Sequence, residues 1–312
     1  MKEIKTKGIS PSELPQIDLV IVSSGYEKRS TFIAIKLRGC LNDSTIKLCC
    51  GFNSNKDNIQ RKRNDKLFEK LGFEYIEGSG DDDHFMEALL NRVIEKSFSQ
   101  FQSINVLIDY SSMTRLWYAS LLRCLYYSNY NLAINIYFAY SFAKYHPPAK
   151  NIVQNIHVNP IDGYSQFSIP DKPTALIIGM GYEAERAYGL TEYFDAETFL
   201  FYNDNSKEEE FVKDVERLNN DLIKIIPPER IYKYPISDLE YLERILYDLC
   251  KSLLDKYRVV IAPCGPKPFT LISLLISLRL NNVDVWRISP GDTRNQITRT
   301  PNGEILIYQV RI

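Results

Sequence analysis

The chain carries one sequence motif twice, separated by a long interval. An apolar run from Asp18 ends in Gly25-Tyr26-Glu27-Lys28-Arg29, and a run from Thr174 ends in Gly181-Tyr182-Glu183-Ala-Glu-Arg186. Gly181 lies 156 positions after Gly25 (181 minus 25). Solenoid repeats have much shorter periods, of roughly 20–50 residues. An interval this long therefore predicts two tandem domains of similar architecture.

A second pair of motifs recurs at nearly the same interval. The segment Asp109-Tyr-Ser111-Ser112-Met113-Thr114-Arg115 follows one apolar run, and Ala262-Pro-Cys264-Gly265-Pro266-Lys267 follows another. Ala262 lies 153 positions after Asp109 (262 minus 109). Both motifs lead into apolar stretches of helical length. Each half of the chain is thus expected to carry an equivalent pair of loops.

Composition limits the class of protein. The 312 residues allow two domains of about 150 residues each. The net charge of −1 excludes a surface that coats a polyanion as a whole, so binding of phosphate would come from local clusters. There is no membrane-length apolar run and no secretory segment, and the six cysteines lack metal-site spacing. We therefore expect a cytoplasmic protein with reduced thiols and no association with a membrane.

Apolar strands alternate with amphipathic helices in both halves. In the first half we expect strands at 17–23, 45–50, 73–76, 104–109 and 132–140, and helices at 29–40, 57–71, 84–97 and 114–128. In the second half we expect strands at 174–179, 198–202, 231–235, 258–262 and 283–288, and helices at 183–193, 207–219, 238–254 and 267–281. The alternation is typical of parallel sheets covered on both faces. The predicted fold class is α/β, with two tandem Rossmann-like domains whose sheets are mainly parallel.

The domain limits follow from turn and proline signals. We place the first domain at 1–165 and the second at 170–312, with the linker inside the proline-containing stretch 160–173. Alternating apolar residues at 152–158 and 304–312 follow turn sequences. We therefore expect each domain to end in a β-hairpin.

The glycine motifs are the first candidates for binding. In open parallel sheets, ligands bind outside the carboxyl ends of the strands, where the strand order reverses. The predicted winding places strand one beside strand four at that point. Glycine lets the backbone approach a ligand, Arg29 and Arg186 suit a phosphate, and Glu27 and Glu183 suit ribose hydroxyls. The alternative is an internal Glu–Arg pair that only shapes the turn.

The second motif offers hydroxyls and a cation at a helix start. Ser111, Ser112, Thr114 and Arg115 are candidates for contacts with an anion. The alternative is a capping serine or threonine beside a solvated arginine. If chemistry occurs, Asp109 is the candidate acid or base. The alternative for Asp109 is that it orders its own loop by accepting backbone N–H bonds.

Two further groups of residues have open interpretations. The sequences Asn53-Ser-Asn55 and Asn203-Asp-Asn205 follow the second predicted strand of each half, and they suit either a base or ribose contact or turn chemistry. The run Asp81-Asp82-Asp83-His84 suits a helix N-cap better than a metal site. No cofactor or metal is predicted. The complete candidate binding set is Ser24, Gly25, Tyr26, Glu27, Arg29, Asn53, Ser111, Ser112, Thr114, Arg115, Gly179, Gly181, Tyr182, Glu183, Arg186, Asn203, Cys264, Gly265 and Lys267.

The second motif resembles a known family signature. A strand followed by Asp109-Tyr-Ser-Ser-Met-Thr-Arg115 is similar to the Asp/Asn-x-Thr-Gly-Gly-Thr-Lys signature of CRISPR-associated Rossmann-fold (CARF) domains. Asp109, Ser111, Thr114 and Arg115 match, whereas Ser112 and Met113 replace the paired glycines. In the second half the acidic position is Ala262, and the small residues and Lys267 remain. Two such units look like the tandem arrangement of SAVED domains.

The resemblance carries functional expectations. Proteins of these families bind cyclic oligonucleotides. A nucleotide-derived anionic ligand is therefore expected, with the chain acting as a sensor component of a prokaryotic anti-phage defence system. A separate effector protein and assembly into a homo-oligomer are consistent with this expectation. The alternative is a ring-nuclease-like enzyme that cleaves its nucleotide ligand, since some CARF proteins do so.

Overall fold

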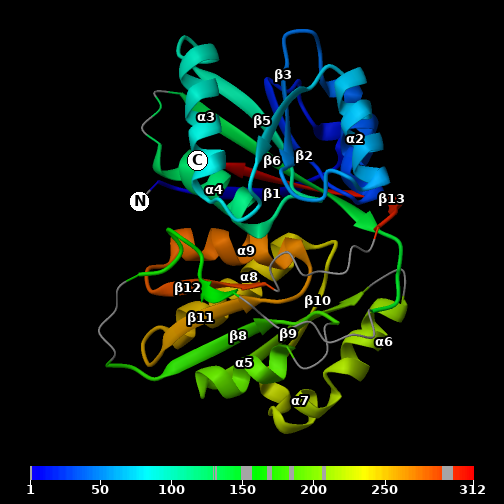
Figure 1. Ribbon diagram of the computed structural model, residues 1–312. Helices are drawn as coiled ribbons and strands as arrows, with labels where there is room; N and C mark the ends of the chain where they lie inside the picture. Colours follow the sequence, from blue (N-terminus) through cyan, green and yellow to red (C-terminus); the bar gives the residue numbers. More distant parts are fainter. Residues whose placement is uncertain are drawn as a thin grey trace. The chain divides into compact units, whose positions relative to one another are not determined.

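The computed structural model describes residues 2–128, 130, 132–148, 157–166, 171–182, 186–205, 209–289 and 298–312. The chain divides into two compact α/β units (Figure 1). Unit 1 comprises Met1–Lys144 and Gln296–Ile312, and unit 2 comprises Tyr145–Asn295. Each unit has one mixed sheet of mostly parallel strands. The C-terminal segment, which we placed in the second domain, thus belongs with the N-terminal part of the chain.

Unit 1 has a seven-stranded sheet with the order β1-β13-β6-β5-β2-β3-β4. The five strands β2 to β6 are parallel, and β13 is antiparallel to both β6 and β1. The strands are β1 (Lys5–Ile9), β2 (Leu19–Ser24), β3 (Ile46–Phe52), β4 (Glu74–Gly78), β5 (Ser103–Asp109), β6 (Ala133–Ala143) and β13 (Pro301–Arg311).

Helices cover both faces of this sheet. One face packs under α1 and α2, where Ile33 and Phe68 join Val20 and Val22 in a buried apolar cluster. The other face lies under α3 and α4, and the Cys50 thiol is 3.8 Å from the sulfur of Met86 in α3. The helices are η2 (Lys28–Thr31), α1 (Phe32–Lys36), η3 (Arg38–Cys40), α2 (Ile59–Lys70), α3 (His84–Ser97) and α4 (Arg115–Tyr127), with η1 at Pro11–Glu13.

Unit 2 has a six-stranded sheet with the order β10-β9-β8-β11-β12-β7. Its strands are parallel except β7, which is antiparallel to β12. The strands are β7 (His157–Pro160), β8 (Thr174–Gly179), β9 (Glu197–Asn205), β10 (Ile231–Pro235), β11 (Arg258–Pro263) and β12 (Val283–Ser289). The helices are α5 (Arg186–Phe194), α6 (Glu209–Leu218), α7 (Asn220–Ile225), η4 (Pro228–Arg230), α8 (Leu239–Leu253) and α9 (Lys267–Arg279).

The parallel strands of the two units follow one winding. Numbered within each unit, the parallel strands lie in the order third, second, first, fourth, fifth. The register also repeats: Ile21 pairs with Ile108 in unit 1, and Ile177 pairs with Ile261 in unit 2. These positions differ by 156 and 153 residues, which are the intervals between the repeated motifs. The prediction that strand one lies beside strand four is confirmed in both units.

The predicted chain endings differ from the structure. Residues 304–312 do not form a hairpin within the second half, because β13 pairs with β6 along one edge and with β1 along the other. In the first half, residues 152–156 lie outside the described residues, and β7 pairs with β12. Part of the predicted linker also belongs to unit 2, since the Ile161 N–H donates to the Val285 carbonyl at 2.8 Å.

Most predicted elements are present with shifts of a few residues. The exceptions are informative. The predicted helix 29–40 is broken into η2, α1 and η3, and the polar edge strand β1 was not predicted. Asn203 lies within β9 rather than in a turn. Among the described residues, no helix combines the length and apolar character needed to span a membrane.

Candidate functional site

The Gly25–Arg29 loop lies at the carboxyl end of β2, beside β5. Its backbone is held by α2, because the buried Asn64 side chain donates to the Gly25 carbonyl at 2.8 Å and to the Glu27 carbonyl at 2.9 Å. Ser24, the last residue of β2, is fully buried, and its hydroxyl makes no hydrogen bond to any described residue. The loop is therefore held in place by α2, at the edge of the sheet where the strand order reverses.

A chain of hydrogen bonds joins this loop to the loop after β5. The Gly25 N–H donates to Ser30 Oγ at 3.3 Å, and the Ser30 hydroxyl donates to Ser112 Oγ at 2.8 Å. The chain of hydrogen bonds ends at Ser112. This residue is half-buried, and its own hydroxyl proton has no acceptor among the described residues. Successive hydrogen bonds polarise one another, so the Ser112 hydroxyl is a strengthened donor. The structure thus brings together two motifs that are more than 80 residues apart.

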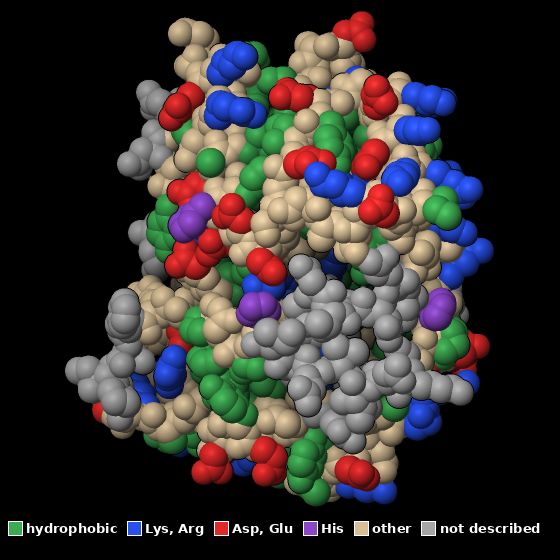
Figure 2. All heavy atoms as spheres, in the orientation of Figure 1, with side chains coloured by type: hydrophobic (Ala, Val, Ile, Leu, Met, Phe, Trp, Pro, Cys, Tyr) green, Lys and Arg blue, Asp and Glu red, His purple; other side chains and the backbone are tan. Residues whose placement is uncertain are grey.

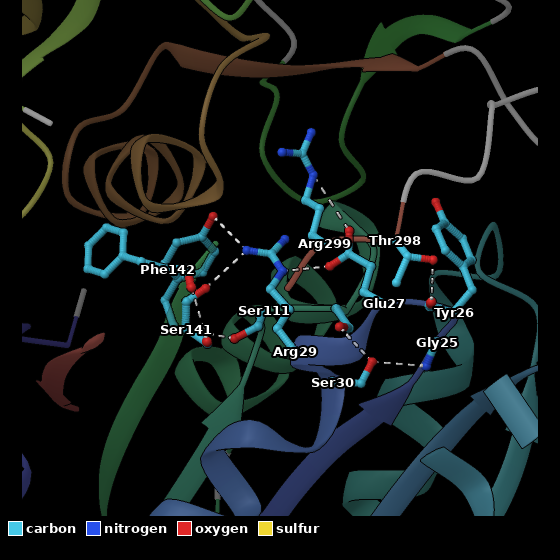
Figure 3. Close-up of polar contacts among 12 residues, drawn as sticks. Gly25, Tyr26, Glu27, Arg29, Ser30, Ser111, Ser141, Phe142, Thr298 and Arg299 are labelled. Atoms are coloured by element: carbon cyan, nitrogen blue, oxygen red, sulfur yellow. Dashed lines mark hydrogen bonds and ion pairs between the residues drawn. The ribbon is translucent and has the colours of Figure 1, made fainter. Parts of the chain in front are cut away.

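Arg29 points into unit 1 and is 4% exposed (Figure 3). Its Nε donates to Glu27 at 2.6 Å, and its Nη1 donates to the Tyr140 hydroxyl at 3.1 Å and to the Ser141 carbonyl at 3.0 Å. Burial alone would lower the pKa of Arg29, but Glu27 and Tyr140 outweigh it and the pKa is raised. The geometry matches the alternative of an internal pair that shapes the turn, rather than a phosphate clamp.

The start of the C-terminal strand completes this side of the loop. The Arg29 N–H donates to the Arg299 carbonyl at 3.2 Å, and Arg299 Nε lies 3.8 Å from the Glu27 carboxylate. The Thr298 hydroxyl donates to the Tyr26 carbonyl at 3.4 Å (Figure 3). The sequence offered no signal for these contacts, because the partners are about 270 positions apart and neither segment has a recognisable motif.

Asp109 ends β5 and is 2% exposed. Its Oδ1 accepts the Ser111 N–H at 2.9 Å, and Ser111 Oγ accepts the Ser141 N–H at 2.8 Å. These bonds tie the loop after β5 to β6. They match the alternative that Asp109 orders its own loop.

Thr114 caps helix α4. Its hydroxyl oxygen accepts the Trp117 N–H at 3.3 Å, and its hydroxyl proton goes to the Gly80 carbonyl at 2.9 Å. The capping alternative therefore describes Thr114. Arg115 is the first residue of α4 and is half-buried.

Two neighbouring residues at this edge are Asn53, a candidate from the sequence, and Phe52, which was not a candidate. Asn53 is exposed after β3, and its N–H donates to the Gly78 carbonyl at 3.0 Å. The ring of Phe52, which no sequence motif marks, stacks on Trp117 at a centroid distance of 4.4 Å. A Cβ added to Gly25 would lie 3.6 Å from the Phe52 ring. The Phe52 ring therefore lies close to the glycine turn.

Unit 2 repeats the glycine loop and the asparagine that holds it. Asn219 donates to the Gly181 carbonyl at 2.9 Å, as Asn64 does to Gly25, and lies 155 positions later. Tyr182 stacks on Phe211 at 5.8 Å. Glu183 lies outside the described residues, and Arg186 is the half-buried first residue of α5. The paired asparagines were missed because no local motif marks them, although the repeat interval would have found them.

In unit 2, the loop after β11 packs tightly on the loop after β8. Gly179 ends β8, and its carbonyl accepts the Cys264 N–H at 2.8 Å. A Cβ at Gly265 would lie 2.3 Å from the Met180 carbonyl oxygen, so only glycine fits there without a shift. Cys264 is buried, and Lys267 is the half-buried first residue of α9.

The asparagine motif of unit 2 does not occupy the position that corresponds to the asparagine motif of unit 1. Asn203 accepts the Ile236 N–H at 3.0 Å from within β9. The register pairs Ser23 with Cys50 and Gly179 with Phe201, so the counterpart of Asn53 is Asp204 rather than Asn203. A shift of one residue places a strand side chain on the opposite face. Asn53 and Asn203 therefore do not form equivalent contacts.

The acidic run before α3 is a helix start. Asp82 accepts the N–H groups of His84 at 3.0 Å and Phe85 at 3.1 Å. Within the part of the chain that the structure describes, no group of three or more His, Cys, Asp or Glu side chains is placed to hold a metal ion.

Comparison with protein-family models finds no matching family, and comparison with curated proteins finds no match.

Proposed function

We propose that the chain consists of two tandem Rossmann-like units and binds a nucleotide-derived anionic ligand at the carboxyl edge of the unit 1 sheet. The observation that carries the proposal is the hydrogen-bond chain Gly25–Ser30–Ser112, which bridges the loops after β2 and β5 where the strand order reverses. In doubly wound sheets this is the place where ligands bind.

The groups at this edge suit a nucleotide. The Ser112 hydroxyl offers a polarised donor to a phosphate oxygen, and the start of α4 adds the positive end of a helix dipole with Arg115 as its first residue. The half-buried ring of Phe52, supported by Trp117, offers a surface on which a base can stack. Arg29 serves instead to hold the loop in shape.

The role that fits these groups is that of a sensor. Asp109 is buried and accepts an N–H of its own loop, so its carboxylate supports loop structure rather than proton transfer. A cyclic oligonucleotide is the ligand that the resemblance to CARF and SAVED domains favours. In this proposal the chain is a cytoplasmic component of an anti-phage system and acts through a separate effector. Cleavage of the ligand is the competing outcome.

Calorimetry with a panel of cyclic oligonucleotides, linear oligonucleotides and mononucleotides tests binding, and mass spectrometry of the same mixtures tests turnover. We expect one class to bind and to be recovered unchanged. Arg115→Ala should weaken binding by about 1.5–3 kcal/mol, the usual range for a hydrogen bond to a charged partner. The exposed Arg244→Ala in α8 is the matched control and should bind normally.

Ser112→Ala removes the end of the hydrogen-bond chain and should also weaken binding. Recovery of a cleaved product would replace the sensor role with that of an enzyme. Absence of binding across the panel, with a folded protein, would contradict the proposal.

A further inference from the structure

The segment 28–70 of unit 1 differs sharply in charge from the rest of the chain. It holds eleven Lys and Arg residues against four Asp and Glu residues, a net charge of +7. The whole chain has a net charge of −1, so all other residues together carry −8. The near-neutral total therefore hides a local concentration of positive charge.

Nine of the eleven cations lie on η2, α1, η3 and α2, whereas Lys47 is in β3 and Lys56 is in the loop before α2. Helices α1 and α2 both pack on the face of the sheet that contains Val20 and Val22, and the Asn64 bonds to Gly25 and Glu27 hold α2 against the loop that precedes η2. Lys and Arg side chains gather along the edge of unit 1 over α2 (Figure 2). The positive layer therefore borders the carboxyl end of β2.

Most of these charges are not neutralised within the protein. Two exposed lysines have carboxylate partners, Lys56 with Glu77 and Lys62 with Asp57. Among the described residues of this segment, six exposed cations form no ion pair, whereas only two exposed carboxylates, Asp43 and Glu69, form none. The six cations are Lys28, Lys36, Arg38, Arg63, Lys66 and Lys70.

The spacing on α2 concentrates charge further. Arg63, Lys66 and Lys70 are three and four residues apart, so they form one stripe along the exposed side of the helix. Like charges at this spacing destabilise a helix by a few tenths of a kcal/mol per pair. An external anion would relieve that repulsion.

We propose that this basic face of unit 1, formed by η2, α1, η3 and α2, binds the phosphodiester backbone of a nucleic acid. A lipid surface fits less well, because an interfacial helix inserts a whole apolar face, whereas α1 and α2 each expose one large apolar side chain, Ile35 and Ile59, and Phe68 of α2 is buried. The contacts are with phosphates and carry no sequence preference. This inference does not depend on the nucleotide site proposed above.

Fluorescence anisotropy with labelled single-stranded RNA and DNA of one mixed sequence tests the proposal at a series of salt concentrations. Both should bind at low salt, and the affinity should fall linearly in a log–log plot, as counterion release requires. The triple variant Arg63→Glu/Lys66→Glu/Lys70→Glu should raise the Kd by at least about tenfold and flatten the salt slope by about 0.7 for each lost phosphate contact.

The matched control is Lys224→Glu/Lys251→Glu/Lys256→Glu, which reverses three exposed lysines of unit 2 with the same change in net charge. It should bind nearly as the parent protein does. Equal losses in both triple variants would show that net charge alone governs binding, and would overturn the proposal. Absence of binding at low salt, or binding only to vesicles containing an anionic lipid, would overturn it as well. Circular dichroism establishes that each variant is folded.

Discussion

Arg29 shows how the partners of a charged side chain decide its role. The residue occupies a loop position suited to phosphate, yet its guanidinium is buried and bonded to Glu27, Tyr140 and the Ser141 carbonyl. Removing one member of a buried pair leaves an uncompensated charge, which typically costs several kcal/mol. Glu27 and Arg29 therefore belong to the framework that positions the loop for the donors beside it.

Gly265 is a residue at which a single methyl group should be costly, because the obstacle is backbone rather than a side chain that can move. In Gly265→Ala the new Cβ would lie 2.3 Å from the Met180 carbonyl oxygen, so the loop after β11 must shift away from β8. Crowding of this kind costs about 1–3 kcal/mol of stability. Urea unfolding followed by tryptophan fluorescence should show that loss.

The control for this substitution is Gly189→Ala in helix α5. A Cβ there meets nothing within 4 Å, and the position is exposed. Alanine is the better helix former, so the variant should gain roughly 0.5–1 kcal/mol. Loss of stability in both variants would show that the close approach to Met180 is not the cause.

The bond between Tyr145 and Asp214 should make stability depend on pH. The Tyr145 hydroxyl donates to Asp214 at 2.6 Å, and this bond raises the pKa of Tyr145 to about 12. Burial opposes the charge of Asp214, but Tyr145 and Arg217 outweigh it and hold its pKa below the usual value. The stabilisation is therefore complete above the unfolded pKa of about 3.9 and is lost as pH falls through the lower folded pKa.

Tyr145→Phe should consequently lower the free energy of unfolding near neutral pH, and lower it less in acid, where Asp214 is protonated. Trp286, the tryptophan of unit 2, reports the transition by fluorescence in a Trp117→Phe background. Tyr188→Phe, at an exposed position of α5, is the control. A cost that stays constant from neutral to acidic pH would contradict the assigned role of the Asp214 charge.

At the scale of elements, the sequence predicts those helices and strands whose formation depends on residues nearby in the chain. The apolar core strands and helix α3, which spans the predicted residues 84–97, have clear local patterns. The segment 29–40 also has a helical pattern, but the Arg29 N–H is bonded to the Arg299 carbonyl and the Ser30 N–H to the Glu27 carbonyl. Those bonds impose a 3₁₀ turn first, and the helix that follows is short.

Elements whose partners are distant in the sequence were predicted less well. The alternating pattern of β13 indicates a strand but does not identify its neighbours, which are β1 and β6. The strand β1 is polar and finds its place only through that pairing. The same limit applies to the site: Gly25 and Ser112 are found from motifs, whereas the contributions of Asn64 and Arg299 come from long-range bonds.

At the scale of the whole molecule, unit 2 is an insertion between two paired strands of unit 1. The chain leaves unit 1 after β6 and returns at β13, where the Lys144 N–H donates to the Thr300 carbonyl at 2.9 Å. Pro301 also pairs with Ala143. The two crossing points are therefore adjacent, and a short loop can span them.

Replacing residues 145–297 with a short Gly-Ser linker should leave unit 1 folded. The linker would close β6 and β13 as an ordinary antiparallel hairpin. A cooperative thermal transition and dispersed amide NMR signals would show this. As the control, the same shortened chain without residues 298–312 should lose its cooperative transition, because β1 then has no strand to pair with. Failure of the linked chain to fold would mean that unit 2 stabilises unit 1.

The position of β13 also has a consequence for the order of events on the ribosome. Lys5 pairs with Arg311, so the ribosome synthesises nearly all of these 312 residues before the partner strand of β1 exists. At synthesis rates of about 5–20 residues per second, that wait is roughly 15–60 s. Unit 2, whose strands all precede β13, can complete its sheet during this time. Unit 1 therefore completes its sheet after unit 2, and the edges of β1 and β6 that pair with β13 stay open until β13 has been translated.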